Sequence, residues 1–255
     1  MMHLLEIKNL TKHFGGLKAL EKVNFQVKAG DILGIIGPNG AGKTTLFNVI
    51  CGIYRPTKGK IFFKGEPIHH LKPFQIAHLG IARTFQIVRP FKNLNVLKNT
   101  MVTYGNRFYG NPISASSTFL KDNHIEEVRK LLGLVDLKDY ECTLAKNLPL
   151  GFQRRLEIAR ALALQPTLLL LDEPFAGLSY EESRELMELI QKVRKRGKTI
   201  MLVEHNMKVA MSLCEKIVVL DHGSKIAEGI PEEIRSNQKV IEAYLGKEEE
   251  NTPGR

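Results

Sequence analysis

The sequence predicts an α/β fold with a mostly parallel sheet covered by helices, an antiparallel β subdomain and an inserted α-helical subdomain. Three observations carry this prediction. Polar and apolar residues alternate near the N-terminus, apolar residues recur at helical spacing in the middle, and short apolar runs alternate with helical segments towards the end. With 255 residues, 43% of them hydrophobic, the chain is long enough for one large α/β domain or two small ones.

The strands are expected where short apolar runs are bounded by turns. Residues 4–8 and 23–27 alternate in polarity and predict antiparallel strands. Residues 31–37 form a compact apolar run, typical of a strand buried on both faces, and a helix is expected over residues 43–50. Further strands are predicted at residues 59–65, 167–172, 199–204 and 216–221.

The middle of the chain, about residues 87–160, is the expected helical subdomain. Apolar residues repeat there at helical spacing, as at Val128, Leu132 and Val135. Residues 106–118 are rich in Gly, Asn, Pro and Ser and predict a loop. A small helical segment is expected after residue 229, and the charged, turn-rich residues 247–255 are expected to fray.

Composition and charge narrow the classes of function. A formal net charge of +10 is compatible with nucleic acid, anionic lipid or an ordinary soluble surface. The densest basic cluster, residues 192–198, fits a helix C-terminus, where cations suit the helix dipole, so we expect no nucleic-acid partner. The three cysteines are far apart in the sequence, which favours isolated thiols over a metal or redox site.

Membrane-spanning and secretory segments are not expected. No apolar run approaches the ~18–20 residues that a spanning helix needs. The first residues lack a basic segment followed by a long apolar core, so they do not resemble a secretory signal. The chain is therefore expected to stay in the cytosol.

Residues 37–44 read Gly-Pro-Asn-Gly-Ala-Gly-Lys-Thr, which fits the P-loop pattern GxxxxGK[ST]. Glycines let main-chain N–H groups surround phosphate oxygens, and the helix that follows points its positive end at the same anion. Lys43 can reach the outer phosphates, and the Thr44 hydroxyl can ligate Mg²⁺. The expected nucleotide contacts in this loop are Gly37, Pro38, Asn39, Gly40, Ala41, Gly42, Lys43, Thr44 and Thr45.

A run of four leucines, residues 168–171, ends in Asp172 and Glu173. A parallel strand brings its carboxyl end beside the P-loop, so Asp172 can hold Mg²⁺ through water and Glu173 can orient and deprotonate the attacking water. Taken alone, the two carboxylates could instead cap a helix. The P-loop and this strand together still leave kinases, GTPases and many ATPases open.

Four further segments resemble the ABC transporter ATPases in their order and spacing. They are the Gln loop at residues 84–86, the signature motif within residues 148–162, the D-loop at residues 176–179 and the histidine switch at residues 203–205. The resemblance covers nearly the whole chain and implies a single ABC ATPase domain over residues 1–255. It implies a P-loop NTPase (RecA-like) core that uses ATP and Mg²⁺, dimerises around two ATP molecules and drives separate membrane permease subunits.

The resemblance also implies roles for individual residues. Phe14 would stack on adenine, with a core phenylalanine as the alternative. Gln86 would sense the γ-phosphate or Mg²⁺ and contact the membrane partner, with an exposed loop glutamine as the alternative, and His205 would hydrogen-bond the γ-phosphate. The catalytic residues implied are Glu173, His205, Gln86 and Lys43, and the metal ligands implied are Thr44, Gln86 and Asp172.

Gly151 of the signature motif would bind the ATP held by the opposite subunit, because the helix that starts near it aims its N-terminus at that γ-phosphate. The family usually reads Leu-Ser-Gly-Gly-Gln, whereas Pro149, Leu150 and Phe152 stand here in place of Ser, the first Gly and Gln. Pro149 offers a phosphate neither a hydroxyl nor an N–H group. We therefore expect a working ATPase whose isolated dimer is weak.

Within the family, the chain resembles most the LivG-type ATPases of branched-chain amino-acid importers. The segments that carry this likeness are residues 80–86, 91–99, 154–160, 204–207, 225–234 and 241–246. Related ATPases that serve urea, other amides or lipopolysaccharide look similar. A soluble ABC ATPase acting on DNA or ribosomes usually has two cassettes or a long coiled coil, and a P-loop kinase would not have the ordered signature and His205.

The resemblance implies partners and a location. The partners are membrane permease subunits, a second ATPase subunit in a homodimer or in a heterodimer with a paralogue, and, indirectly, a periplasmic or extracellular binding protein. The chain would lie peripherally on the cytoplasmic face of the cell membrane. The transported solute would not touch this chain.

Overall fold

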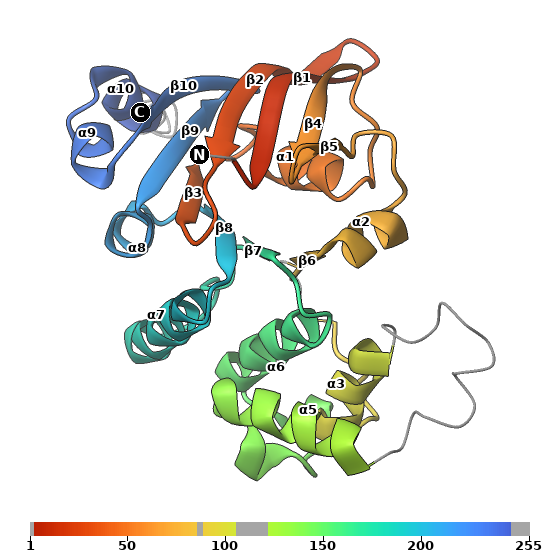
Figure 1. Cartoon of the computed structure of the whole chain (residues 1–255). Coiled ribbons are helices and arrows are strands. Elements are labelled where there is room, and N and C mark those ends of the chain that lie inside the picture. The colour runs from red at the N-terminus through yellow and green to blue at the C-terminus, as the bar shows by residue number, and fades with distance from the viewer. Residues whose placement is uncertain (1–2, 86–88, 106–121, 246–255) are drawn as a thin grey trace. The chain divides into compact units, whose positions relative to one another are not determined.

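The chain forms two units (Figure 1). The computed structural model describes residues 3–85, 89–105 and 122–245. The first unit combines Met1–Ile76 with Thr199–Arg255, and the second is Ala77–Lys198. The chain first passes from one to the other within helix α2, Pro73–Leu79.

An antiparallel sheet begins the first unit, with the strand order β2-β1-β4-β5. Leu5 pairs with Val27, and buried apolar side chains of β1 alternate with more exposed ones at the start of the strand. The two predicted N-terminal strands are confirmed and are longer than expected. The bounds are β1 Leu5–Phe14, β2 Leu17–Val27, β4 Lys58–Phe63 and β5 Glu66–Pro67.

Four strands of the other sheet belong to this unit, in the order β10-β9-β3-β8, and β9, β3 and β8 are parallel. Strand β3 is parallel to both neighbours, and all residues of β3 and β8 are buried, which explains their continuous apolar sequence. Strand β10 is antiparallel to β9. The bounds are β3 Ile32–Ile36, β8 Thr199–Glu204, β9 Lys216–Asp221 and β10 Ser224–Gly229.

The helices of the first unit follow these strands (Figure 1). Helix α1 has the predicted bounds, and the predicted C-terminal helical segment consists of α9 and α10. Asn206 caps α8 by accepting hydrogen bonds from the N–H groups of Lys208 (3.0 Å) and Val209 (3.4 Å). The bounds are α1 Lys43–Ile50, α8 Met207–Leu213, α9 Pro231–Arg235 and α10 Gln238–Leu245.

The second unit contains two parallel strands and a group of helices. Strand β6, Ile81–Arg83, pairs with β7, Leu168–Asp172. Helices α3, α5 and α6 pack together, and Ser179 caps α7 in a capping box with Glu182. The helices are α3 Val96–Gly105, α5 Asp122–Leu134, α6 Leu150–Ala163 and α7 Tyr180–Lys195, with short 3₁₀ turns at Lys138–Tyr140 and Ala145–Asn147.

Most predicted elements are found, and the differences have physical reasons. Strands β5, β6 and β10 were not predicted, because β5 and β6 are two and three residues long and β10 includes Lys225 and Glu228. The predicted loop at residues 106–118 and the fraying end at residues 247–255 lie outside the described residues. The boundary of the helical subdomain at about residues 87–160 stays a prediction. No helix in the described ranges is long and apolar enough to cross a membrane.

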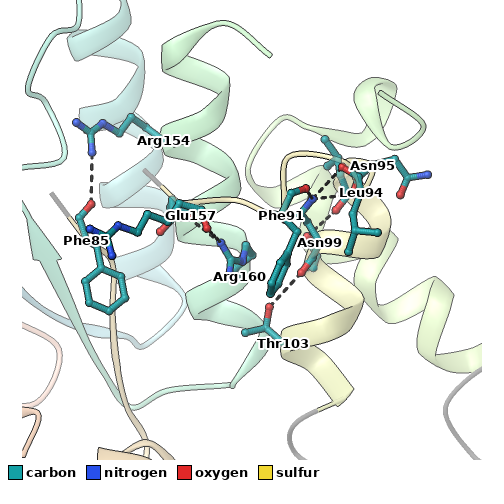
Figure 2. A network of polar contacts seen from close by, with 12 residues as sticks. Phe85, Phe91, Leu94, Asn95, Asn99, Thr103, Arg154, Glu157 and Arg160 are labelled. Carbon is teal, nitrogen blue, oxygen red and sulfur yellow. Dashed lines mark hydrogen bonds and ion pairs between the residues drawn. The ribbon is translucent and has the colours of Figure 1, made fainter. Parts of the chain in front are cut away.

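Asn99 is a fully buried polar residue that ties the preceding loop to helix α3 (Figure 2). Its Nδ2 donates to the carbonyl oxygens of Phe91 (3.0 Å), Leu94 (3.0 Å) and Asn95 (3.1 Å). Its Oδ1 accepts from the Phe91 N–H group at 2.8 Å. One side chain therefore satisfies several main-chain groups of this loop.

We expect Asn99→Ala to lower the free energy of unfolding by ~2–4 kcal/mol, because buried main-chain groups lose their partner. The control is Asn95→Ala, which removes an exposed hydrogen bond from the Lys98 N–H group at the start of α3 and should cost ~1 kcal/mol. Urea unfolding of both variants measures the difference. Equal losses would contradict this account of Asn99.

Candidate functional site

The loop between β3 and α1 has the backbone that a phosphate cradle needs. Gly37 has a φ angle of 152°, and a Cβ there would lie 2.1 Å from the Leu220 carbonyl oxygen. Gly42 has a φ angle of 99°, and a Cβ there would lie 2.5 Å from the Ala19 carbonyl oxygen. Side chains are thus excluded on the outer side of the loop, as expected where main-chain N–H groups turn inward to an anion.

Lys43, the first residue of α1, closes this loop. It is 6% exposed, and its Nζ donates to the carbonyl oxygens of Gly37 (2.7 Å) and Pro38 (2.9 Å). Its ammonium group is therefore held over the loop. Thr44 is exposed and Thr45 half-buried in the first turn, where the helix has its positive end. The loop, the cation and the hydroxyl together suit a phosphate group with its metal ion.

His205 follows the strand that pairs with β3. Ile36, the last residue of β3, lies opposite Glu204, the last residue of β8, in parallel register. Gly37 and His205 are the next residues, so the P-loop and the predicted histidine switch leave the same edge of the sheet. His205 is exposed, directly before the capping residue Asn206.

Phe14, the residue expected to stack on adenine, ends β1 and is 39% exposed. Its ring meets Tyr54 edge to face, with centroids 5.1 Å apart, and Lys12 Nζ lies 4.7 Å from its centroid. Sequence reasoning missed Tyr54 and Lys12. Tyr54 is distant in sequence and has no motif of its own, so no local signal could have found it.

Tyr244 of α10 is a second residue that sequence reasoning missed. Burial raises its pKa to about 12, while the Gly37 main-chain amide acts in the opposite direction. Its hydroxyl oxygen is buried, and Gly37 is the main-chain group that acts on it. The C-terminal helix therefore reaches the first residue of the P-loop.

Asp172 is the buried carboxylate at the end of β7. It is 2% exposed, and its Oδ2 accepts a hydrogen bond from Arg83 Nη2 at 2.6 Å. Its Oδ1 is buried without a hydrogen-bond partner among the described residues. An orphaned buried carboxylate oxygen suits a water-bound Mg²⁺. Sequence reasoning missed Arg83, although it lies just before the Gln loop.

Glu173, directly after β7, has a left-handed backbone conformation. Its φ angle is +47°, in the left-handed region that non-glycine residues rarely adopt, and its carbonyl oxygen accepts from the Ala176 N–H group at 3.2 Å. The chain therefore turns directly after β7, and the Glu173 side chain is half-buried at this turn.

Gln86 lies outside the described residues, but the residues before it are described. The Thr84 N–H group donates to the Leu170 carbonyl oxygen at 2.9 Å, and the Thr84 hydroxyl accepts from the Asp172 N–H group at 3.4 Å. The Gln loop and the carboxylates therefore follow neighbouring strands of the second unit.

The signature motif begins helix α6, as predicted. Pro149 is the N-cap residue and makes no side-chain cap, and it is exposed together with Leu150. A Cβ at Gly151 would lie 3.0 Å from Glu182 Oε1, a residue of the α7 capping box. Gly151, near the start of α6, therefore lies beside Glu182, near the start of α7.

Phe152, which replaces the usual glutamine, packs within the helical region. Its ring centroid lies 4.6 Å from that of Tyr140, and the Arg155 guanidinium lies 5.6 Å from it. This side chain therefore contributes packing where the usual residue is polar.

The structure places the predicted residues in two groups. Phe14, residues 37–45 and His205 belong to the first unit, and Gly151, Asp172 and Glu173 belong to the second. Among the described residues, no cluster of three or more His, Cys, Asp or Glu side chains could hold a metal ion. A metal ion at Asp172 would need other ligands, such as hydroxyl and phosphate oxygens.

The Arg83–Asp172 pair allows a test of stability. Arg83→Met should lower the free energy of unfolding by ~3–5 kcal/mol, because it leaves a buried carboxylate unpaired. In an Asp172→Asn background the same change should cost much less, since no charge remains to be compensated. Denaturant unfolding of the four proteins measures this, and an equal cost in both backgrounds would contradict it.

Comparison with known proteins agrees with this geometry. Residues 20–176 match the family model described as ABC transporter, and residues 224–250 match that described as Branched-chain amino acid ATP-binding cassette transporter. The ATP-binding protein LivG of Escherichia coli is 41% identical, with 96% of this chain and 98% of LivG covered. BraF of Pseudomonas aeruginosa is 42% identical with the same coverage.

Solved structures agree as well. An ATP-binding cassette of an ABC transporter in its ADP conformation has a TM-score of 0.86 at 32% identity, covering 96% of this chain and 100% of that one. A nucleotide-free cassette has a TM-score of 0.85 at 32% identity, covering 95% and 99%. The predicted α/β fold of the P-loop NTPase type is confirmed. The chain belongs to the ABC transporter family and is one of its ATP-binding, ATP-hydrolysing cassettes.

Proposed function

We propose that this chain is the motor subunit of an ABC importer for branched-chain or other hydrophobic amino acids. The full-length likeness to LivG and BraF, whose names give branched-chain amino-acid transport, carries this proposal. The match of residues 224–250 to a branched-chain cassette model supports it independently. These relatives favour an amino-acid importer over the motors for urea or lipopolysaccharide and over soluble ABC ATPases.

In this proposal each predicted site residue has a role in ATP binding or hydrolysis. Phe14 stacks on adenine, and Gly37, Pro38, Asn39, Gly40, Ala41, Gly42, Lys43, Thr44 and Thr45 hold the phosphates. Thr44, Gln86 and Asp172 ligate Mg²⁺, which supplies charge neutralisation when bound. Glu173 accepts the proton of the attacking water, and His205 contacts the γ-phosphate. Gly151 of one subunit completes the site of the other, in a homodimer or a heterodimer with a paralogue.

A groove in the second unit is the proposed contact with the permease subunits. It has a volume of about 380 Å³, and four residues of its lining, Phe85, Thr103, Glu157 and Arg160, are labelled in Figure 2. Its lining mixes an exposed aromatic ring with guanidinium groups: Arg83, Phe85, Arg89, Thr103, Glu157, Arg160, Ala161 and Leu164. A cytoplasmic segment of a permease with apolar and acidic side chains fits this lining.

The proposed assembly lies on the cytoplasmic face of the membrane. The permease subunits cross the membrane, and a periplasmic or extracellular binding protein delivers the amino acid to them. Reconstitution of this chain with its permeases and binding protein in liposomes tests the proposal. ATP-driven uptake of leucine, isoleucine or valine is expected, and uptake of urea instead would contradict it.

The hydrolytic role of Glu173 is tested by Glu173→Gln, which keeps the size of the side chain but removes the base. We expect ATP binding to persist and hydrolysis to fall by ~10²-fold or more. An ATP-dependent dimer should accumulate and be visible by size-exclusion chromatography. The control is Glu181→Gln, which changes a carboxylate on α7 that is 79% exposed. Near-normal turnover of Glu173→Gln would overturn the assignment.

The docking role of the groove is tested by filling it. Thr103→Phe adds a ring inside the groove and should weaken permease binding by roughly 10-fold or more. Its control is Val102→Phe, at an exposed neighbour on the same helix that does not line the groove. The ATPase rate of the isolated chain should stay within ~2-fold for both, since neither residue belongs to the nucleotide site. Equal permease affinity of the two variants would contradict docking here.

A further inference from the structure

Three charged side chains form a ridge along helix α6, which the signature motif begins. Arg154, Glu157 and Arg160 follow one another at three-residue spacing, so each is a neighbour of the next on the helix surface (Figure 2). Arg154 and Glu157 are each 7% exposed, and the Arg160 side chain is 19% exposed. Charged groups are rarely so buried unless they are paired, so each member of the ridge is expected to have polar partners.

Arg154 joins two loops of the proposed site to this helix. Its Nη1 donates to the Phe85 carbonyl oxygen at 3.5 Å, directly before Gln86. Its Nη2 donates to the Ala176 carbonyl oxygen at 3.2 Å, at the start of the D-loop. One guanidinium therefore contacts the chain after β6 and the chain after β7 from α6.

The other two members of the ridge, Glu157 and Arg160, contact the main chain of Arg89, which follows Gln86 in the chain. Arg160 Nη1 donates to the Arg89 carbonyl oxygen at 3.0 Å and to Glu157 Oε1 at 2.8 Å. Glu157 interacts with the Arg89 main-chain amide. Residues 85 and 89, which precede and follow Gln86 in the chain, are therefore both bonded to helix α6.

The charges of Arg154 and Arg160 both act on the Glu157 carboxylate. Burial raises the pKa of Glu157 above its ordinary value, while the charges of Arg160 and Arg154 and the Arg89 amide act in the opposite direction. The carboxylate thus lies between two guanidinium groups and compensates both. Removing one member changes the electrostatic balance of the others.

The next residue on the helix shows what a purely structural arginine does here. Arg155 is equally buried, and its Nη1 and Nη2 bind Asp136 Oδ2 and Glu185 Oε2, each at 2.7 Å. Arg155 Nη1 also donates to the Val135 carbonyl oxygen at 3.5 Å. All these partners lie outside the residues assigned to the nucleotide site. Arg154 differs because it donates to the carbonyl oxygens of Phe85 and Ala176, in two loops that carry predicted site residues.

We propose that Arg154 is a positioning residue for ATP hydrolysis: with Glu157 and Arg160 it fixes residues 85 and 89, on either side of Gln86, and Ala176 of the D-loop against the signature helix. The proposal rests on the role proposed for Gln86. Because the ridge lies in the second unit and the P-loop in the first, it should govern turnover rather than nucleotide affinity.

The experiment compares Arg154→Met with the matched control Arg155→Met, each alone and combined with Gln86→Ala, in the full-length chain. ATPase kcat and KM and thermal stability are measured for each. Arg154→Met should lower kcat by ~10-fold with KM within ~2-fold, whereas Arg155→Met should lower stability and leave kcat within ~2-fold. In the Gln86→Ala background, Arg154→Met should cost less than ~2-fold more, because both changes remove the same positioning.

Three results would overturn the proposal: independent, multiplicative losses of kcat, an equal loss in Arg155→Met, or a change confined to KM. If Arg154→Met does not fold, Arg154→Lys keeps the charge but loses the planar fork that reaches two carbonyl groups. It should then show a reduced kcat at near-native stability, and a full rate would overturn the proposal. A normal rate in Gln86→Ala alone would instead contradict the role proposed for Gln86, so the two failures are distinguishable.

Discussion

Strand β3 is bonded on both sides to parallel neighbours, with Ile36 opposite Glu204 of β8 and Val219 of β9. This register decides where the phosphate loop begins and which residue follows the paired strand. A slip by one residue would move His205 out of step with Gly37 at the carboxyl ends of these strands. The position of Gly37 and His205 at one edge is therefore a consequence of how an apolar layer packs. The chemistry depends on that packing.

Charged groups inside the second unit are held by pairing. Arg83 binds one oxygen of Asp172 and leaves the other buried without a partner among the described residues, which orients the carboxylate. Glu173, the next residue, stands in a left-handed backbone conformation that the surrounding strand and turn must maintain. An enzyme that moves a proton at this point benefits from such rigidity, because reacting groups must be placed before the reaction begins.

The unusual signature motif is compensated by packing. Pro149 starts α6 without a side-chain cap, and its fixed φ angle suits the entry to a helix. Phe152 packs against Tyr140 and Arg155, so the residue that replaces a polar one stabilises the first turn from the side. Gly151 stays glycine where Glu182 comes close. This motif therefore keeps the close approach of two helix starts while losing a hydroxyl.

The sequence by itself determined the P-loop, the carboxylate strand, the order of the family motifs and most strand and helix positions, because each rests on neighbours along the chain. Local patterns predicted α1 with its observed bounds but missed β10, whose polar residues obscure the strand. Only the tertiary structure decided the partners of Asp172, Phe14 and Arg154. Arg83 is 89 residues from Asp172, and Phe85 is 69 residues from Arg154. Such contacts form only when distant segments pack together, so no local pattern of residue types encodes them.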